Sequence, residues 1–444
     1  MQTMSPLQTM HKDQRYLVVG LGMTGYSAAC YLLQLGYQCK VQDNREQPPY
    51  LAEFQQNFPS VEVIKGELSE FQLSNIDCLV VSPGLSIRSP LMQKVARSGK
   101  QIMGDIELFA QAVNKPVLAI TGSNGKSTVT SLLGEMIKAD GKNAAVGGNI
   151  GVPALQLLSD DVDFYVLELS SFQLETTSSL RPLISTVLNV SEDHMDRYEN
   201  LKDYQQCKKS IYSNAINCLS NFDDASTRQS PTDIQFSLHN ASCEYTVTGT
   251  ENPMLAVDGE GWINTTALKL KGRHNWANCL AAIAMARVAG ISKPAILKAL
   301  ESYAGLPHRS EWIAEINGVS WINDSKATNP GATKAAIEGL DEPVILLAGG
   351  QSKGANVAIL CESLSQHVKT VLLFGQDADV LQQSWNECVN IQRVDNLEQA
   401  VQIANQIAVT GDIVLLAPAC ASFDMYSGFP ARGDHFKGLV RALS

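Results

Sequence analysis

A glycine-rich loop that ends in a lysine and a serine could bind the phosphates of a nucleotide. The loop, residues 122–128, follows four apolar residues and precedes apolar residues at helical spacing, so we expect a strand, a turn and a helix start. Backbone N–H groups and the positive helix end then point at one position, which suits a triphosphate. Lys126 would meet the outer phosphates and the Ser127 hydroxyl would bind Mg²⁺. Ile120 stands where the usual spacing has a further glycine, and a tight turn with an exposed lysine is the alternative.

Glu168 could complete a metal site, and His194 is a second candidate functional residue. Glu168 ends the apolar run 164–167, and His194 lies just past another apolar run. A carboxylate at the end of a strand beside the phosphate loop can bind Mg²⁺, which favours few protein ligands together with phosphate oxygens. The alternatives are a glutamate in solvent and a structural or surface histidine.

Lys208 raises a question of burial. If residues 201–216 form a helix, Tyr204, Lys208, Ile211 and Ala215 share one inward face. A buried ammonium is costly unless it is paired or chemically altered. From the residues alone, we expect the Lys208 side chain to extend along the surface until its amine reaches water.

Polar turns in the last third of the chain predict a second ligand crevice. Asp324 and Lys326 follow one strand-like run, and Lys353 and Ser422 follow two others. Ligands of open α/β sheets bind at the carboxyl ends of the strands. Each turn alone would be an ordinary loop.

The beginning of the chain carries a dinucleotide fingerprint. A strand-like run, residues 16–19, leads into Gly20, Gly22 and Gly25 at the spacing GxGxxG, and Asp43 ends the next run. This pattern is typical of a Rossmann-type turn that binds a diphosphate. By itself it is weak support for NAD.

Strand-like runs and helical patterns alternate along the whole chain, which predicts an α/β protein with mostly parallel sheets. The alternation restarts twice, so we expect three domains at residues 1–104, 105–305 and 306–444. The first and third resemble Rossmann folds, and the second is of the P-loop ATPase type. Residues 218–271 predict an antiparallel elaboration of the second domain.

Composition restricts the partners and the location. With 34 Lys and Arg against 45 Asp and Glu, the net charge is −11, and no basic tract stands out, so nucleic acid and anionic membranes are not expected partners. No apolar signal core begins the chain, and no apolar run approaches the roughly 18 residues needed to span a bilayer. Ten cysteines without a CxxC pair predict reduced thiols. We expect a cytoplasmic monomer without membrane insertion.

These residues together resemble the Mur ligases, ATP-dependent enzymes that add amino acids to the peptide stem of bacterial cell-wall precursors. The resemblance covers nearly the whole chain, and it is greatest to the members that add D-glutamate to UDP-N-acetylmuramoyl-L-alanine. The motifs occur in the family's order and are TGSNGKST, LELSSFQLE, NVSEDHMDR, GRHNWAN, GLPHR, NDSKATN and PACASFD.

The resemblance implies a role for each matching residue. ATP would be bound by Gly122, Ser123, Asn124, Gly125, Lys126, Ser127, Thr128, Asn275, Asn278, Arg309, Asp324 and Lys326. The UDP-sugar would be bound by Met23, Thr24, Asn44, Arg45, Ser82, Asn149 and Gln173, and D-glutamate by Thr328, Lys353, Ser422, Phe423 and Phe429. Ser127, Glu168, His194 and Lys208 would form the Mg²⁺ site, and Lys126, His194 and Lys208 would be catalytic.

Three consequences of the resemblance bear on the open questions. Lys208 matches a lysine that the family carbamylates, which would replace a buried cation by an anionic group able to bind Mg²⁺. The Gly20 turn would accept the UDP diphosphate, which replaces the dinucleotide interpretation. Asn44 stands where threonine is expected, so the uridine contacts differ at this position.

The expected activity is an ATP-dependent ligation through an acyl phosphate. A ligase of the folylpolyglutamate synthase type and a Mur ligase for another amino acid are the nearest alternatives. A nucleotide-gated binding protein would leave Lys126, Glu168 and Lys208 without a chemical task. A nicotinamide-dependent dehydrogenase would have to bind NAD.

Overall fold

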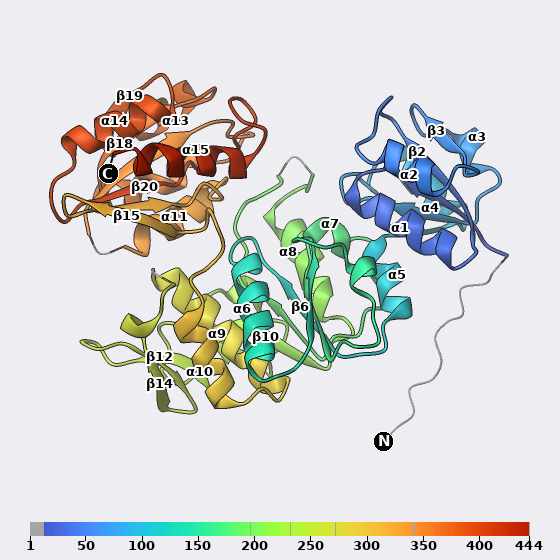
Figure 1. The fold of residues 1–444 in the computed structure, drawn as a ribbon, viewed down its shortest axis with the longest axis horizontal. Helices are drawn as coiled ribbons and strands as arrows, with labels where there is room; N and C mark the ends of the chain where they lie inside the picture. The colour runs from blue at the N-terminus through green and yellow to red at the C-terminus, as the bar shows by residue number, and fades with distance from the viewer. Residues whose placement is uncertain (1–12, 196, 231, 271, 341, 444) are drawn as a thin grey trace.

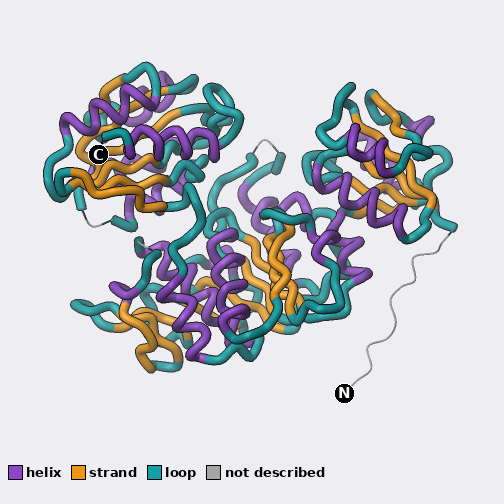
Figure 2. Tube along the Cα trace, viewed as in Figure 1, coloured by secondary structure: helices purple, strands orange, loops and turns teal. Residues whose placement is uncertain are grey.

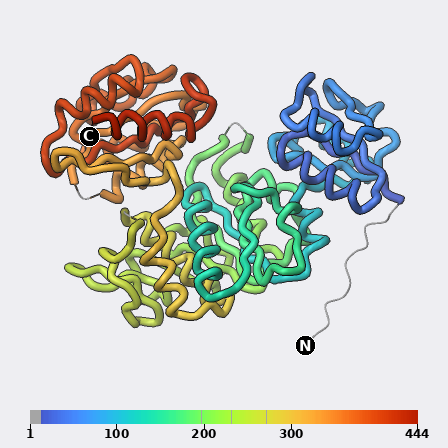
Figure 3. Tube along the Cα trace, viewed as in Figure 1, coloured from blue at the N-terminus to red at the C-terminus, as the bar shows by residue number. Residues whose placement is uncertain are grey.

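The protein consists of three α/β units that follow one another along the chain, with the middle unit between the other two (Figures 1 and 3). The computed structural model describes residues 13–443 except 196, 231, 271 and 341. The first 12 residues, part of the stretch in which no signal core is predicted, and Asp196 of the NVSEDHMDR motif therefore lie outside the described residues. Each unit is built on one sheet, and helices lie around the strands (Figure 2).

The first unit has a parallel sheet of order β3-β2-β1-β4-β5. The strand order reverses between β1 and β4, and ligands of open α/β sheets bind at such a point. The strands are β1 (Arg15–Val19), β2 (Gln38–Asp43), β3 (Val63–Lys65), β4 (Cys78–Val81) and β5 (Gln101–Met103). The helices are α1 (Met23–Gln34), α2 (Leu51–Asn57), α3 (Glu70–Leu73) and α4 (Pro90–Arg97).

The middle unit has a nine-stranded sheet of order β14-β13-β12-β11-β10-β9-β6-β8-β7. Its strands are β6 (Val117–Thr121), β7 (Ala144–Gly148), β8 (Phe164–Glu168), β9 (Ile184–Val187), β10 (Asn217–Asn221), β11 (Ile234–Phe236), β12 (Tyr245–Thr248), β13 (Met254–Val257) and β14 (Glu260–Asn264). Its helices are α5 (Asp105–Ala112), α6 (Lys126–Ala139), α7 (Ser171–Leu174), α8 (Leu201–Lys209), α9 (Arg273–Val288) and α10 (Lys293–Ser302).

The direction of the strands in this sheet corrects one expectation. β12, β13 and β14 are antiparallel, as predicted for residues 218–271. β10 and β11 run parallel to their neighbours, so the prediction is wrong for them. Helix α9 packs against α6 and α10, and its residues 279–286 are all fully buried. This apolar support holds α6 and the phosphate loop at its start.

The third unit has a sheet of order β15-β16-β20-β17-β18-β19, parallel except for the β15–β16 hairpin. The strands are β15 (Glu311–Ile316), β16 (Val319–Asn323), β17 (Val344–Gly349), β18 (Val368–Phe374), β19 (Ile391–Arg393) and β20 (Ile413–Leu416). The helices are α11 (Pro330–Glu338), α12 (Cys361–His367), α13 (Ala378–Trp385), α14 (Leu397–Ile407) and α15 (Phe429–Arg441).

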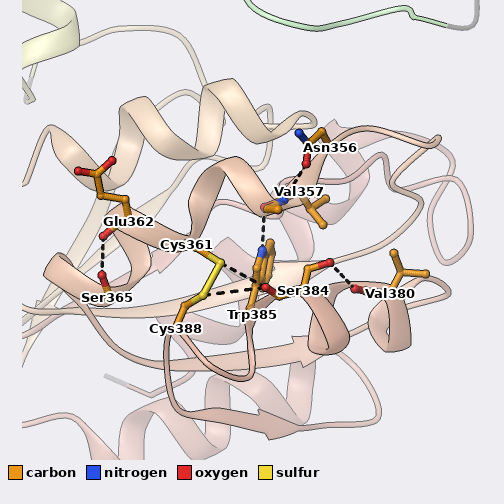
Figure 4. The surroundings of a disulfide bond; sticks show 10 residues. Asn356, Val357, Cys361, Glu362, Ser365, Val380, Ser384, Trp385 and Cys388 are labelled. Atoms are coloured by element: carbon orange, nitrogen blue, oxygen red, sulfur yellow. Dashed lines mark hydrogen bonds between the residues drawn. A yellow bond between two sulfur atoms is a disulfide. The ribbon is translucent and has the colours of Figure 1, made fainter.

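A disulfide joins Cys361 at the start of α12 to Cys388 after α13 (Figure 4). Beside it, the fully buried indole of Trp385 donates a hydrogen bond from Nε1 to the Val357 carbonyl, at 2.8 Å. The expectation that all ten thiols are reduced is wrong for this pair. The two cysteines are 27 positions apart, and no local sequence pattern predicts that they pair. The fold of the third unit brings them together.

Within the described ranges, no helix has the length and apolar character needed to cross a membrane.

Candidate active site

A cavity of about 930 Å³ lies where the middle and third units meet. Its lining combines the phosphate loop, the ends of β8 and β9, and the polar turns of the third unit. The predicted residues that line it are Ser123, Asn124, Gly125, Lys126, Ser127, Thr128, Asn149, Glu168, His194, Lys208, Asn275, Asn278, Arg309, Asp324, Lys326, Thr328, Lys353, Ser422, Phe423 and Phe429. The structure therefore brings the predicted ATP, metal and D-glutamate residues to one place. Of these residues, Gly122 is not among those that line the cavity.

The phosphate loop connects β6 to α6 and depends on glycine at its last turn. Gly125 has φ +81°, and a Cβ there would lie 2.3 Å from Oδ1 of Asn278. Asn278 in turn donates to Asn275, at 2.9 Å. The left-handed conformation and the close approach together favour glycine over any other residue at this position.

Asn189 and Ser191, which the sequence reasoning missed, support the phosphate loop from the segment that follows β9. The Asn189 carbonyl accepts from the Ser123 N–H and its side chain accepts from the Asn124 N–H, at 2.9 and 2.8 Å. The Ser123 hydroxyl donates to the Ser191 carbonyl at 2.9 Å. Their position in the polar stretch just past a strand, next to His194, was the available signal.

Glu168 connects the phosphate loop to a predicted UDP-sugar residue. Its carboxylate accepts from the Ser127 hydroxyl and, at 2.7 Å, from the Asn149 amide. Arg309 of the GLPHR motif donates to the same Ser127 oxygen at 2.6 Å. The carboxylate is buried, so the alternative of a glutamate in solvent is wrong.

Lys208 is fully enclosed, with 1% of the residue exposed. Its Nζ donates to the Gly122 carbonyl at 2.9 Å and lies 4.4 Å from the centre of the Tyr204 ring. Burial and the nearby Lys126 ammonium lower the pKa of Lys208 well below its ordinary value. The expectation that the amine reaches water is wrong. Helix α8 ends at Lys209, so Ala215 does not belong to the predicted helical face.

Among the described residues, four lysines and one arginine line the cavity, namely Lys126, Lys208, Lys326, Lys353 and Arg309. Lys126 donates only to backbone carbonyls, of Gly122 at 2.8 Å and Ser123 at 2.9 Å, among its described hydrogen bonds. Burial lowers the pKa of Lys126 and of Arg309, and burial together with the neighbouring cations lowers that of Lys326 to about 8. Perturbed pKa values that cluster in one cleft are typical of a functional site.

The acidic groups fit a divalent cation only in part. Among the described residues, no three His, Cys, Asp or Glu side chains lie together as a metal site. His194 lies in the cavity wall with φ +57°, its ring 4.7 Å from that of Phe172. Burial raises the pKa of Asp324, across the cavity, to about 6. The donors on the middle unit suit Mg²⁺, which takes few protein ligands when phosphate oxygens complete its shell.

The third unit contributes aromatic and cationic groups. Lys326 Nζ lies 4.3 Å from the centre of the Phe429 ring, and Lys353 Nζ lies 5.5 Å from that of Phe423. Arg432, which the sequence reasoning missed, is buried beneath this surface and donates to Ser325 and to the Cys420 carbonyl. No local pattern distinguishes this arginine from the other charged residues of α15. It holds together the two turns that carry Lys326 and Ser422.

The residues predicted for the UDP-sugar in the first unit do not line this cavity. Asp43 accepts from the Leu21 N–H at 2.6 Å and forms an ion pair with Arg45 at 2.7 Å, which lowers the pKa of Asp43 to about 2. The Ser82 hydroxyl donates to the Gly20 carbonyl at 3.0 Å. This second cluster, at the point where the strand order of the first unit reverses, also carries Met23, Thr24 and Asn44.

Gln173 lies neither in the cavity wall nor in the cluster of the first unit. It is buried in the first turn of α7, where it bonds Ser170 and donates to Asp105 at 3.1 Å. Burial raises the pKa of Asp105 to about 6.

Comparison with known proteins covers all three units. Models of the "Mur ligase MurD-like, N-terminal domain", the "Mur ligase middle domain" and the "Mur ligase, glutamate ligase domain" match residues 14–104, 120–286 and 308–420. Curated proteins named UDP-N-acetylmuramoylalanine–D-glutamate ligase are similar along nearly their full length. That of Coxiella burnetii is 43% identical over 98% of this chain and 100% of the relative, and that of Marinobacter nauticus is 45% identical over 97% and 99%.

Solved structures share the fold at low identity. A pseudomurein peptide ligase type C from Methanothermus fervidus has a TM-score of 0.62 at 17% identity, covering 97% of this chain and 100% of its own. UDP-N-acetylmuramate-alanine ligase from Thermotoga maritima has a TM-score of 0.59 at 18% identity, with the same coverage. The three matching domain models and the identity to full-length relatives agree with the site, and the chain belongs to the Mur ligase family.

Proposed function

We propose that the protein is the ATP-dependent ligase that joins D-glutamate to UDP-N-acetylmuramoyl-L-alanine in the cytoplasmic synthesis of peptidoglycan precursors. The relatives at 43–45% identity that carry this name support the choice of substrates. The observation that carries the proposal is the convergence of Lys126, Arg309 and Lys326 on one cavity. Such a set of cations suits a polyphosphate, and it lies beside the turns proposed for the amino acid.

In the first step, an oxygen of the alanyl carboxylate attacks the γ-phosphorus of ATP. The bond from that phosphorus to the β–γ bridging oxygen breaks, so ADP leaves and an acyl phosphate forms. Lys126 and Arg309 would offset the charge that spreads over the transferring group, which is the main catalytic task in phosphoryl transfer. Asn275, Asn278, Asp324 and Lys326 would hold the nucleotide.

In the second step, the amine of D-glutamate attacks the acyl carbon. The tetrahedral intermediate collapses with loss of inorganic phosphate, and the amine gives up a proton as the amide forms. Lys353 and Ser422 would bind the D-glutamate carboxylates, with Thr328, Phe423 and Phe429 around them. Closure of the third unit would exclude water that otherwise hydrolyses the acyl phosphate.

Mg²⁺ would be held by Ser127, Glu168, His194 and a carbamate on Lys208, and it would supply positive charge to the phosphate oxygens. Carbamylation adds CO₂ to the neutral amine with loss of one proton. The lowered pKa of Lys208 supports this role, since it favours the neutral, nucleophilic form of the amine.

The three domains would divide the substrates. Residues 1–104 would bind the UDP-sugar through Met23, Thr24, Asn44, Arg45 and Ser82, with Asn149 and Gln173 of the middle domain near the sugar and its alanine. Residues 105–305 would bind ATP, and residues 306–444 the amino acid. The protein would act as a monomer.

One assay tests the proposal. The purified protein is incubated with UDP-N-acetylmuramoyl-L-alanine, ATP, Mg²⁺ and one amino acid at a time, and phosphate release is measured. We expect release with D-glutamate and none with L-glutamate, L-lysine or L-alanine. Release with a different amino acid would indicate a Mur ligase of another specificity, and release with a folate in place of the UDP-sugar would indicate the folylpolyglutamate type.

A further inference from the structure

A partly buried ionic network joins the first unit to the middle unit close to the cavity, with Arg88 34% and Asp203 27% exposed. Its members are Arg88 from the loop between β4 and α4, and Glu175, Arg197 and Asp203 from the middle unit. The side chains of Glu175 and Arg197 are 4% and 9% exposed. An ion pair so enclosed is costly to break, because one charge would remain buried without its partner.

Arg88 reaches across from the first unit to two carboxylates. Its Nε donates to Glu175 at 3.0 Å, and its two terminal nitrogens donate to the two oxygens of Asp203. The guanidinium also lies 4.9 Å from the centre of the Tyr198 ring. This planar double contact is specific for arginine, since lysine offers a single charge without the fork.

Arg197 reaches in the opposite direction. It donates to the Pro83 carbonyl at 2.9 Å and the Leu85 carbonyl at 2.7 Å, and it pairs with Glu175 at 3.0 Å. Its guanidinium lies 4.0 Å from the centre of the Phe172 ring. Glu175 thus connects both arginines, and the turn of the first unit is held from two sides.

The positions of these residues in the fold link the two clusters of site residues. Pro83 and Leu85 follow Ser82 directly, and the Ser82 hydroxyl donates to the Gly20 carbonyl of the glycine turn. On the other side, Glu175 follows α7 after the Glu168 strand, Arg197 shares a loop with His194, and Asp203 lies on α8 with Lys208. The loop that carries His194 and the helix that carries Lys208 therefore both contact the loop between β4 and α4, which begins at Ser82.

We propose that Arg88 and Arg197 are positioning residues that fix the UDP-sugar turn of the first unit against the reaction centre of the middle unit. This inference rests on the proposed function, because it assigns the first unit to the UDP-sugar. Neither arginine is among the residues that line the cavity. The two arginines set the distance between the alanyl carboxylate and the γ-phosphate. A small change in the distance between reacting groups slows a reaction strongly.

The variants Arg88→Met and Arg197→Met test the inference, because methionine keeps the apolar stem and removes the charge. We expect kcat to fall and the KM for UDP-N-acetylmuramoyl-L-alanine to rise about tenfold, the size of a lost charge-assisted hydrogen bond. The KM for ATP should stay within about twofold, because these contacts leave the phosphate loop intact. Arg88→Lys should recover only part of the activity.

Binding of UDP alone, measured by titration calorimetry, separates positioning from a structural role. UDP would contact only the first unit, so its affinity should be unchanged in both variants while ligation slows. Loss of UDP affinity in parallel with kcat would overturn the inference, since the variants would then have damaged the first unit itself. Unchanged KM and kcat in both variants would overturn it as well.

Two further arginines serve as matched controls. Arg15→Met removes a bidentate pair with Asp77 inside the first unit, and Arg228→Met removes a guanidinium stacked on Phe222 inside the middle unit. Neither joins two units, so both should keep wild-type kinetics. The wild type is assayed in parallel, and its failure to release phosphate would count against the proposed function. Small-angle X-ray scattering of the Arg88→Met/Arg197→Met double variant needs no substrate: we expect a larger radius of gyration, and an unchanged profile would contradict the inference independently.

Discussion

Replacing Lys208 by methionine should abolish ligation and yet stabilise the protein. The Lys208 side chain is fully buried, and its surroundings lower the pKa of its amine well below the ordinary value. Burial therefore penalises the charged form that this amine has in the unfolded chain. Each pKa unit of this depression costs about 1.4 kcal/mol of stability. Methionine has a similar length and carries no charge, so the cost disappears.

The stability lost when methionine replaces the lysine is small. Lys208 donates one hydrogen bond, to the Gly122 carbonyl, which is worth about 1 kcal/mol. That carbonyl keeps a donor in the variant, because Lys126 Nζ also bonds it at 2.8 Å. We therefore expect a net gain if the pKa depression exceeds about one unit, and each 1 kcal/mol of gain would raise the melting temperature by about 2–4 °C for a domain of this size.

The gain should depend on pH in a definite direction. Between the lowered pKa of folded Lys208 and the unfolded value of about 10.4, the unfolded chain binds more protons than the folded one. Wild-type stability from this group therefore rises with pH across that range. The advantage of Lys208→Met should be largest at pH values below the lowered pKa of Lys208 and vanish as the pH approaches about 10.4.

The measurement is thermal unfolding at several pH values in CO₂-free buffer without Mg²⁺, together with phosphate release. Lys208→Ala is the matched variant, since it leaves a cavity. Short carboxylic acids should restore part of the activity of Lys208→Ala. They should restore none to Lys208→Met, because the methionine side chain fills the cavity. A methionine variant that is less stable than the wild type at every pH would refute the reasoning on burial. Full activity of unrescued Lys208→Ala would refute the carbamate role.

Three further predictions concern other parts of the chain. Lys126→Ala should abolish phosphate release while calorimetry still detects UDP-sugar binding; near-normal turnover would remove the loop from the mechanism. Gly125→Ala should raise the KM for ATP, because the new Cβ would lie 2.3 Å from Asn278 Oδ1, whereas Gly141→Ala, at φ +74° with nothing within 4 Å, should leave it unchanged. Cys361→Ser should lower the free energy of unfolding of oxidised protein by about 3.5 kcal/mol, from closure of a loop of 27 residues. Urea unfolding of the wild type and of Cys361→Ser, with and without reductant, tests this prediction. A difference in the free energy of unfolding that persists under reductant would contradict the role of the disulfide.

The local patterns of the sequence were sufficient to predict most elements near the site. The apolar run before the phosphate loop forms β6, and the loop ends where α6 begins at Lys126. Glu168 ends β8, which pairs with β6 as expected. These features follow from short-range rules, because strand, turn and helix start are specified by residues a few positions apart. The strand direction of β10 and β11 was not predictable in this way, since pairing depends on distant partners.

The sequence by itself therefore determined the fold class, the phosphate loop and the identity of the polar residues at the strand ends. Only the tertiary structure decided which of them meet. Arg309 reaches Ser127 across 182 positions, Arg88 reaches Asp203 across 115, and Lys208 is enclosed beside Gly122 across 86. Such contacts arise from the packing of whole units, and so do the burial and the pKa values that follow from it. No periodicity or spacing within one segment records which distant surface will cover a side chain.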